Sequence, residues 1–315
     1  MSEITHDDIA QFAVEKINLP KEIADKHRKQ VNLLRERLEA KIDEDPAFDL
    51  VKMLHAGSVA KGTALRTVND LDVAMYVKTG DAPQADGKLI PWLAERLAEA
   101  NPNMKPEQFE PQTHCVTINF RGSGLNVDVV PVLYEGAEDD CGWLVRKHTG
   151  ERVLTSIPLH LRFMSDRKRL YGDDYKQLIR IVKWWKRTKD LRFKSFMIEL
   201  LWARLAATGT SLADYPTTLE DFFTYIVKSG LKERVFFTDH YSATGLPASN
   251  TGVIEIFDPV NRDNNIAKNY EESDRQAIVK AAHEALDAIG EAKYATTKTE
   301  AVECWQDILG RGFKG

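Results

Sequence analysis

The sequence predicts an α+β protein in which a mixed first half is followed by a nearly all-helical second half. Two strand-like segments, residues 115–120 and 125–133, flank a turn-forming Arg-Gly-Ser-Gly run at residues 121–124. In the second half of the chain the apolar residues follow helical spacing instead. With 315 residues, 43% of them hydrophobic and 29% charged, the chain can bury a sizeable core. We therefore expect a mixed domain over residues 1–160 and a helical domain over residues 161–315, with the functional cleft between them.

The expected elements begin with a long helix over residues 21–43, because Pro20 suits a first helical turn and apolar residues then recur at helical spacing. A strand over residues 71–77 and a helix over residues 92–100 follow in the first domain. Residues 245–265, rich in Asn, Pro and Gly, predict a long loop around one short strand at residues 253–257. The helices expected in the second domain cover residues 174–187, 195–208, 219–228, 273–289 and 299–309.

Composition excludes several classes of protein. No apolar run approaches the roughly 18 residues that span a membrane, and the N-terminus lacks the regions of a signal peptide, so we expect a cytoplasmic protein. The three cysteines are far apart and the eight histidines form no HExxH or HxxxH pair, so any catalytic metal must be held by oxygen. The net charge of −5 weighs against a long nucleic-acid duplex as substrate.

Three aspartates form the candidate catalytic centre. Asp70 and Asp72 are two residues apart on an expected strand, so their side chains share one face. Two like charges this close need a counter-charge, and Mg²⁺ prefers oxygen ligands. Asp128 interrupts another apolar strand, where, taken alone, it could equally form a salt bridge with an arginine.

Taken together, three carboxylates on neighbouring strands can hold two metal ions roughly 3.5–4 Å apart, an arrangement suited to phosphoryl transfer. We expect Asp70 and Asp72 to bind both Mg²⁺ ions, for which Mn²⁺ can substitute. Asp128 is expected to bind the catalytic ion and to help deprotonate the attacking hydroxyl.

A glycine–serine turn precedes these acids. Gly57 and Ser58 open a short helical segment, where backbone N–H groups face an anion and glycine lets the backbone approach phosphate closely. Ser58 adds a hydroxyl donor, and Lys61 adds positive charge for a triphosphate. A lone Gly-Ser pair is usually only a turn, but here it stands twelve residues before an Asp-x-Asp pair, with a third Asp on a later strand.

These motifs together resemble the signature of polymerase-β-like nucleotidyltransferases. The run at residues 57–66 is similar to that of the bacterial cGAS/DncV-like nucleotidyltransferases (CD-NTases), relatives of the oligoadenylate synthetases. Residues 178–186 and 194–201 resemble two motifs of that family's helical lobe, and residues 257–265 resemble its Asp-Pro…Asn loop. The resemblance spans about residues 55–267, and it implies a polymerase-β-like palm followed by an oligoadenylate-synthetase-like helical lobe.

The resemblance also implies which residues bind the donor nucleotide. Lys183 and Ser195 match residues that contact its triphosphate, and Phe196 matches an aromatic residue that stacks on its base. A point charge, a hydroxyl group and a π-face suit these tasks. Phe196 could instead be a core residue of an amphipathic helix, and Arg262 replaces a proline that is often found in the family's loop.

The implied reaction is nucleotidyl transfer. A ribose hydroxyl of one nucleotide attacks the α-phosphate of ATP or GTP, pyrophosphate leaves, and a later attack closes a cyclic di- or trinucleotide that acts as a second messenger in anti-phage (CBASS-type) defence. The expected partners are nucleoside triphosphates, ATP first among them, and the resemblance is compatible with a regulatory protein and a downstream effector. The chain lacks the Cys/His metal insertion of the DNA-sensing animal branch, so we expect no zinc and no obligatory DNA.

Three other functions are possible on the same or a related scaffold, and each would be accompanied by different features. An RNA- or tRNA-tailing transferase would carry a basic surface and additional RNA-binding modules, neither of which is evident in the sequence. An antibiotic-modifying transferase would place an acidic acceptor pocket near the palm, and the helical-lobe motifs argue against it. A catalytically inactive binding protein is disfavoured because all three aspartates are present.

Overall fold

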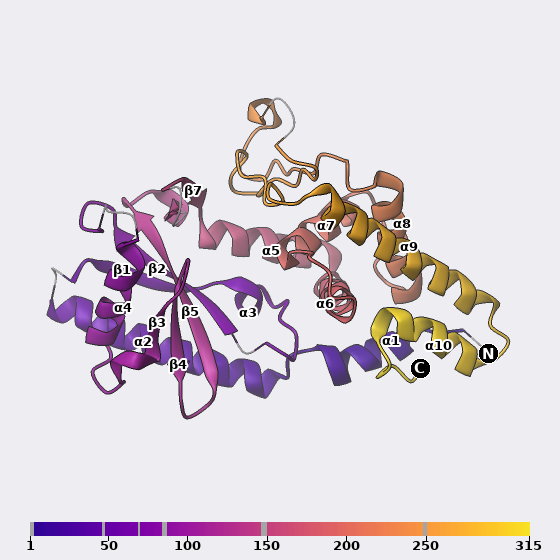
Figure 1. The fold of residues 1–315 in the computed structure, drawn as a ribbon, viewed down its shortest axis with the longest axis horizontal. Coiled ribbons are helices and arrows are strands. Elements are labelled where there is room, and N and C mark those ends of the chain that lie inside the picture. Colours follow the sequence, from indigo (N-terminus) through magenta and orange to yellow (C-terminus); the bar gives the residue numbers. More distant parts are fainter. Residues whose placement is uncertain (1–2, 46–47, 69, 84–86, 146–149, 248–250) are drawn as a thin grey trace. The chain divides into compact units, whose positions relative to one another are not determined.

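The structure, a computed structural model, describes residues 3–45, 48–68, 70–83, 87–145, 150–247 and 251–315. The chain forms two compact units (Figure 1). The mixed unit comprises Leu19–Met164, and the helical unit comprises Met1–Asn18 together with Ser165–Gly315. The predicted α+β class, a mixed sheet with helices followed by a helical lobe, is confirmed.

The sheet of the mixed unit has the strand order β1-β2-β5-β4-β3, and β6 pairs with both β5 and β7. Strands β2 and β5 are parallel, whereas the other pairs of neighbours are antiparallel. Each of the central strands β2 and β5 is therefore paired with a neighbouring strand along both of its edges. The strands are β1 (Leu50–His55), β2 (Asp70–Lys78), β3 (Phe109–Pro111), β4 (Val116–Phe120), β5 (Leu125–Tyr134), β6 (Gly142–Val145) and β7 (Arg152–Thr155).

Helices α2 and α4 of the mixed unit cover one face of this sheet. The predicted long helix is confirmed as α2, with Pro20 at its N-cap position. The helical segments are α2 (Lys21–Glu44), α3 (Gly57–Lys61), α4 (Leu89–Glu99), the short turns η3 (Pro106–Gln108) and η4 (Glu138–Asp140), and α5 (Ile157–Tyr171), which continues into the helical unit.

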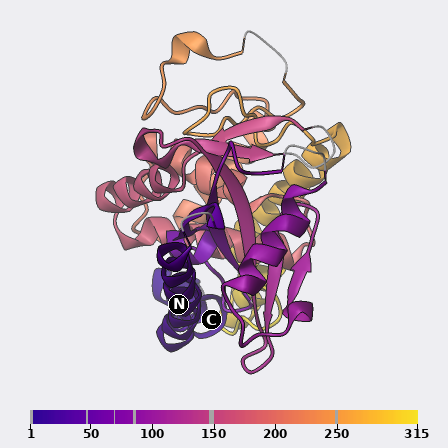
Figure 2. The same ribbon diagram turned by 90° about the vertical axis from the view of Figure 1, so that its left-hand side faces the viewer.

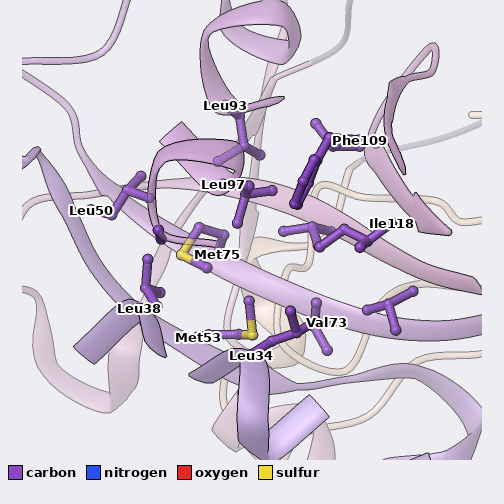
Figure 3. Packing of buried hydrophobic residues seen from close by; sticks show 14 of the residues in the cluster. Leu34, Leu38, Leu50, Met53, Val73, Met75, Leu93, Leu97, Phe109 and Ile118 are labelled. Carbon is purple, nitrogen blue, oxygen red and sulfur yellow. The ribbon is translucent and has the colours of Figure 1, made fainter. Parts of the chain in front are cut away.

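A single apolar cluster joins α2 and α4 to the sheet (Figure 3). Leu34 and Leu38 of α2 and Leu93 and Leu97 of α4 are each at most 1% exposed. They pack with the residues of one sheet face, which on β2 are the alternate positions Leu71, Val73, Met75 and Val77. Because side chains alternate along a strand, Asp70 and Asp72 are left on the opposite face.

Farther along that opposite face, a smaller apolar cluster replaces the carboxylates. It contains Ala74 and Tyr76 of β2 and Val132 of β5, all at most 2% exposed. The Tyr76 hydroxyl donates to the backbone oxygen of Asp140 at 3.0 Å. The carboxylates on β2 therefore lie at the solvent-exposed start of this strand, and the rest of the same face of the strand is buried.

The helical unit has an aromatic core. Trp202 stacks on Phe222 with ring centroids 4.5 Å apart, and Trp185 lies 4.9 Å from Phe223. Among the described residues no helix is both long enough and apolar enough to cross a lipid bilayer. The helical segments of the helical unit are α1 (His6–Phe12), the π-helical turn η1 (Ala13–Ile17), α6 (Asp173–Thr188), α7 (Ser195–Ala207), α8 (Tyr215–Ser229), the short turn η5 (Ala243–Gly245), α9 (Glu272–Tyr294) and α10 (Lys298–Leu309).

The observed units differ in two respects from the expected division at residue 160. That position lies inside the continuous helix α5, and the units change between Met164 and Ser165. In addition, the first 18 residues belong to the helical unit rather than to the mixed one. The reason is apolar packing, because the ring of Phe12 makes edge contacts with Trp184 and Phe313, and the N- and C-terminal segments lie side by side (Figure 2).

Helix α5 and helix α1 were not expected, although both carry sequence signals. Ser156 Oγ accepts a hydrogen bond from the backbone N–H of Leu159 at 3.2 Å, so Ser156 acts as a cap before Pro158. Thr5 and Asp8 form a capping box at the start of α1. Strands β1, β3, β6 and β7 were also missed, and of these β3, β6 and β7 are only three or four residues long.

The expected strand at residues 253–257 is wrong. Only isolated bridges form there, at Ile256 and Phe257. The side chain of Asn265 takes the place of a strand partner: its Oδ1 accepts from the N–H of Ile256 at 3.1 Å, and its Nδ2 donates to the backbone oxygen of Ile254 at 2.8 Å. A side-chain amide that satisfies both backbone groups removes the need for a neighbouring strand.

We predict that Phe12→Ala destabilises the protein by roughly 3–5 kcal/mol, because it removes a buried ring from an aromatic cluster. Val14→Ala, in the same N-terminal segment but 64% exposed, serves as the control and should change stability by less than about 0.5 kcal/mol. Urea unfolding of the full chain measures both. Equal stability of the two variants would contradict the packing of the N-terminal segment in this unit.

Candidate active site

The pairing of β2 with β5 brings the three predicted aspartates together. In this parallel pair Asp72 is the Cα partner of Asp128, and Asp70 is the partner of Asn126. Partner residues of a sheet direct their side chains to the same face. Asp70 and Asp72 are exposed and Asp128 is half-buried, while Leu71 and Val127 between them are buried on the other face. The three carboxylates therefore lie on one face of two neighbouring strands, as the expected strands for Asp70, Asp72 and Asp128 require.

Gly57 packs directly against the Asp72 carboxylate. The backbone N–H of Ala56 donates to the backbone oxygen of Asp72 at 2.9 Å, which holds the start of α3 beside β2. A Cβ atom at position 57 would lie 1.8 Å from Asp72 Oδ2, and Gly57 has a φ of +65°. Only glycine fits both this contact and this backbone conformation.

Ser58 and Lys61 belong to the same short helix. The backbone oxygen of Ser58 accepts from the N–H of Thr63 at 2.8 Å, and the left-handed Gly62 ends α3 directly after Lys61. Both side chains are half-buried. The predicted Gly-Ser turn thus opens α3 next to the aspartates.

Strand β4 and the residue directly before it add two groups to the site that were not predicted from the sequence. Thr117, the Cα partner of Asp128, donates its hydroxyl to Asp128 Oδ1 at 2.7 Å. Burial first, and then the charge of Asp128, raises the pKa of the Cys115 thiol to about 11, so the thiol is protonated at neutral pH. The available signal was the alternation of residues 115–120, which places Cys115 and Thr117 on one face of a strand next to β5.

The donor-site residues inferred from the resemblance lie in the helical unit. Lys183 of α6 is 3% exposed, and its Nζ is 3.0 Å from Oε1 of Glu199 on α7, which is itself 2% exposed. The sequence reasoning did not identify Glu199, whose position in an apolar helix was the available signal. Lys183 is therefore an interior lysine in an ion pair.

Ser195 and Phe196 begin α7 and are both half-buried. Two interactions hold the residue before them: the backbone N–H of Lys194 donates to the Tyr270 hydroxyl at 2.8 Å, and Lys194 Nζ donates to the backbone oxygen of Ile266 at 2.7 Å. The segment that follows the Asp-Pro…Asn loop thus fixes the N-terminal turn of α7. Phe196 lies outside the fully buried core.

A second basic group lies close to this turn. Lys186 Nζ donates to the backbone oxygen of Phe193 at 2.7 Å. Burial, and then the neighbouring charge of Lys183, lowers the pKa of the Lys186 ammonium. Positive charge therefore gathers before the N-terminus of α7, where the helix dipole is also positive.

The residues of the mixed unit fit a magnesium site of the kind that substrate completes. Among the described residues, no three His, Cys, Asp or Glu side chains are grouped closely enough to hold a metal ion by themselves. Mg²⁺ is usually bound by one or two carboxylates together with substrate phosphates and water. Adjacent Asp72 and Asp128 carboxylates, one of them oriented by a hydroxyl donor, match that donor set.

Comparison with known proteins identifies relatives along the whole chain, although no protein-family model matches it. A cyclic AMP-AMP-AMP synthase of Escherichia coli (strain MS 115-1) is 45% identical over 317 residues, which cover 99% of this chain and 98% of the relative. A CBASS oligonucleotide cyclase CdnC of Escherichia coli (strain KTE188) is 30% identical over 321 residues, again covering 99% and 98%.

Solved structures agree. CdnC of E. coli MS115-1, determined in complex with HORMA-deltaN and also with ATP, matches with a TM-score of 0.95 at 45% identity over 99% of both chains. Vibrio cholerae DncV cyclic AMP-GMP synthase, bound to nonhydrolyzable GTP, matches with a TM-score of 0.70 at 11% identity over 99% of this chain and 97% of DncV, and thus shares the fold.

The family resemblance found in the sequence is confirmed by the 45% identity to a relative over 99% of this chain. The shared fold and the placement of the aspartates on β2 and β5 agree with it. The chain belongs to the CD-NTase family, the nucleotidyltransferases that include the oligonucleotide cyclases of CBASS.

Proposed function

We propose that this protein joins three molecules of ATP into cyclic AMP-AMP-AMP and releases three pyrophosphates, as a signal in CBASS anti-phage defence. The observation that carries the proposal is the register of β2 and β5, which sets Asp72 beside Asp128 with Gly57 against the Asp72 carboxylate. The 45% identity to a cyclic AMP-AMP-AMP synthase supports the choice of base and ring size. The protein acts in the cytoplasm, where ATP is available.

In this proposal, Asp128 accepts the proton of the attacking ribose hydroxyl. The hydrogen bond from the Thr117 hydroxyl to Oδ1 holds this carboxylate in position. Asp70, Asp72 and Asp128 hold two Mg²⁺ ions, with Mn²⁺ as a substitute. When bound, these ions neutralise the charge that develops on the attacking and leaving oxygens.

Gly57, Ser58 and Lys61 contact the triphosphate from the mixed unit. Lys183, Ser195 and Phe196 of the helical unit bind the triphosphate and base of the donor nucleotide. The resemblance of residues 178–186 to the family's motif supports this role for Lys183, and its ion pair with Glu199 holds the side chain in position. The fixed first turn of α7 supports this role, because Ser195 and Phe196 then need little reordering when a ligand binds.

The relatives also suggest how the enzyme is controlled. E. coli MS115-1 CdnC forms a complex with HORMA-deltaN. We propose a HORMA-domain protein as the regulatory partner of this chain, a downstream effector that reads the product, and no obligatory DNA.

The decisive experiment incubates purified protein with labelled ATP, GTP, CTP or UTP and Mg²⁺ or Mn²⁺, with and without a HORMA partner. Products are treated with phosphatase and identified by mass spectrometry, and nuclease digestion assigns the linkage. We expect a phosphatase-resistant cyclic trimer of AMP that disappears with EDTA and in Asp70→Asn/Asp72→Asn. Both substitutions preserve side-chain size, so the variant should remain folded.

Other outcomes decide between the alternatives. Linear tails on added RNA would replace this proposal with the RNA-tailing transferase. A cyclic product that contains another base would keep the class of enzyme and refute the proposed product. Undiminished product in Asp70→Asn/Asp72→Asn would show that these carboxylates do not carry the reaction.

Gly57→Ala should lower the rate of product formation about 100-fold, because its Cβ must displace the Asp72 carboxylate, and misplacement by about 1 Å can cost that much. Gly124→Ala is a matched control. Its φ of +66° gives the same backbone strain, but its Cβ would meet no atom within 4 Å. Initial rates and thermal unfolding of both variants are the measurements. Similar loss of stability with similar rates in the two variants would refute the steric argument.

Thr117→Val removes the hydroxyl that orients Asp128 while keeping the shape of the side chain. A hydrogen bond to a charged group contributes roughly 1.5–3 kcal/mol, so we predict at least a tenfold fall in kcat and a higher Mg²⁺ requirement. Thr117→Ser should restore most of the rate. An unchanged rate and Mg²⁺ dependence in the valine variant would show that Asp128 needs no such support.

A further inference from the structure

A small pocket within the helical unit lies outside the residues assigned so far. Its volume is about 300 Å³, and its lining brings together three arginines from distant parts of the chain. Arg167 comes from α5, Arg204 from α7 and Arg234 from the segment after α8. The remaining lining residues are Phe236, Phe237, Thr238 and Asp239.

One of the three arginines is neutralised at the pocket itself. Both terminal nitrogens of Arg167 donate to the two carboxylate oxygens of Asp239, with the second bond 2.8 Å long. The Arg167 guanidinium also lies 5.6 Å from the centroid of the Phe237 ring. Arg167 and Asp239 therefore form a fixed, paired wall of the pocket.

The other two arginines are held from outside the lining. Arg204 donates through Nε and Nη2 to Glu233, and Arg234 donates through Nε to Glu255 at 3.1 Å and through Nη2 to the backbone oxygen of Pro247. Neither glutamate lines the pocket. Within the described part of the chain, Nη1 of Arg204 and Nη1 of Arg234 make no hydrogen bond, and the two side chains are 43% and 31% exposed.

The supporting glutamates are themselves anchored. The Tyr225 hydroxyl donates to Glu233 at 2.8 Å, and Thr251 donates to Glu255 through both its N–H and its hydroxyl at 3.0 Å. Two guanidinium groups are thus fixed in place with donors to spare. Preorganised guanidinium groups lose little conformational entropy when they bind a phosphate through paired N–H···O bonds.

Phe236 adds an exposed aromatic face at the same place. It is 36% exposed, unlike Phe237 beside it, which is 8% exposed. An aromatic ring next to guanidinium groups suits a nucleobase attached to phosphate. The volume lies at the lower end for small-molecule sites, which suits a diphosphate or a compact nucleotide rather than an oligonucleotide.

We propose that this pocket is a second, metal-independent anion site that binds a diphosphate group, either as free pyrophosphate or as part of a nucleotide. Arg204 and Arg234 bind the phosphate oxygens, and Phe236 stacks on the base when a nucleotide is present. The site does not depend on the catalytic carboxylates. It would allow a substrate or product of the reaction to act on the helical unit.

The test is isothermal titration of pyrophosphate, ADP and adenosine into the full-length protein in EDTA, which removes metal-dependent binding. Arg204→Gln/Arg234→Gln should weaken pyrophosphate binding at least tenfold. The control Arg121→Gln/Arg169→Gln makes the same change of charge at side chains that are 59% and 79% exposed, and it should bind like wild type. Asp72→Asn should also bind like wild type, because it alters only the carboxylate centre.

Two further variants sharpen the result. Phe236→Ala should weaken ADP binding several-fold and leave pyrophosphate binding unchanged, which separates the two sources of diphosphate. Arg204→Lys keeps the charge but loses the paired donors, and a several-fold loss in this milder variant tests the site if the double variant unfolds. Equal pyrophosphate affinity in all variants, or no binding by wild type at millimolar ligand, would overturn the proposal.

Discussion

The parallel pairing of β2 with β5 is the constraint on which the rest of the mixed unit depends. It sets Asp72 beside Asp128, two like charges on neighbouring strands, a placement that costs free energy by itself. The opposite face of the same strands is buried against α2 and α4, so a shift of one residue would bury the carboxylates and expose Leu71 and Val73. The apolar core therefore fixes the register, and the register fixes the site.

The two units treat charge in different ways. The mixed unit leaves Asp70 and Asp72 exposed, next to a backbone that approaches without a side chain at Gly57. The helical unit buries Lys183 and Glu199 together, so that each charge has a partner in the interior. Removing one member of such a buried pair leaves an uncompensated charge, and this ties the position of the lysine to the integrity of α6 and α7. The solvent-facing acids of the mixed unit are accessible to exchangeable ligands, whereas the buried pair fixes α6 and α7 relative to each other.

Much of this arrangement could be predicted from the sequence because its signals are local. The spacing of Asp70 and Asp72, the apolar strand around Asp128 and the Gly-Ser turn each depend on a few neighbouring residues. What could not be predicted depends on contacts between distant residues. Thr117 becomes part of the site only through its pairing across β4 and β5, and Glu199 only through its contact with α6. The strand expected around residue 255 failed for the same reason, since Asn265 satisfies its backbone from ten residues away.

Because the N-terminal segment packs in the helical unit, its contacts can form only after distant parts of the chain have been synthesised. Phe12 packs against Phe313, so the two rings of this contact are synthesised about 300 residues apart. At roughly 5–20 residues per second, about 300 residues of translation separate them, an interval of roughly 15–60 seconds. During that interval the mixed unit, which is complete at Met164, can fold while both ends of the helical unit remain unjoined. The apolar face that contains Phe12 must therefore remain free of aggregation until Phe313 has been synthesised.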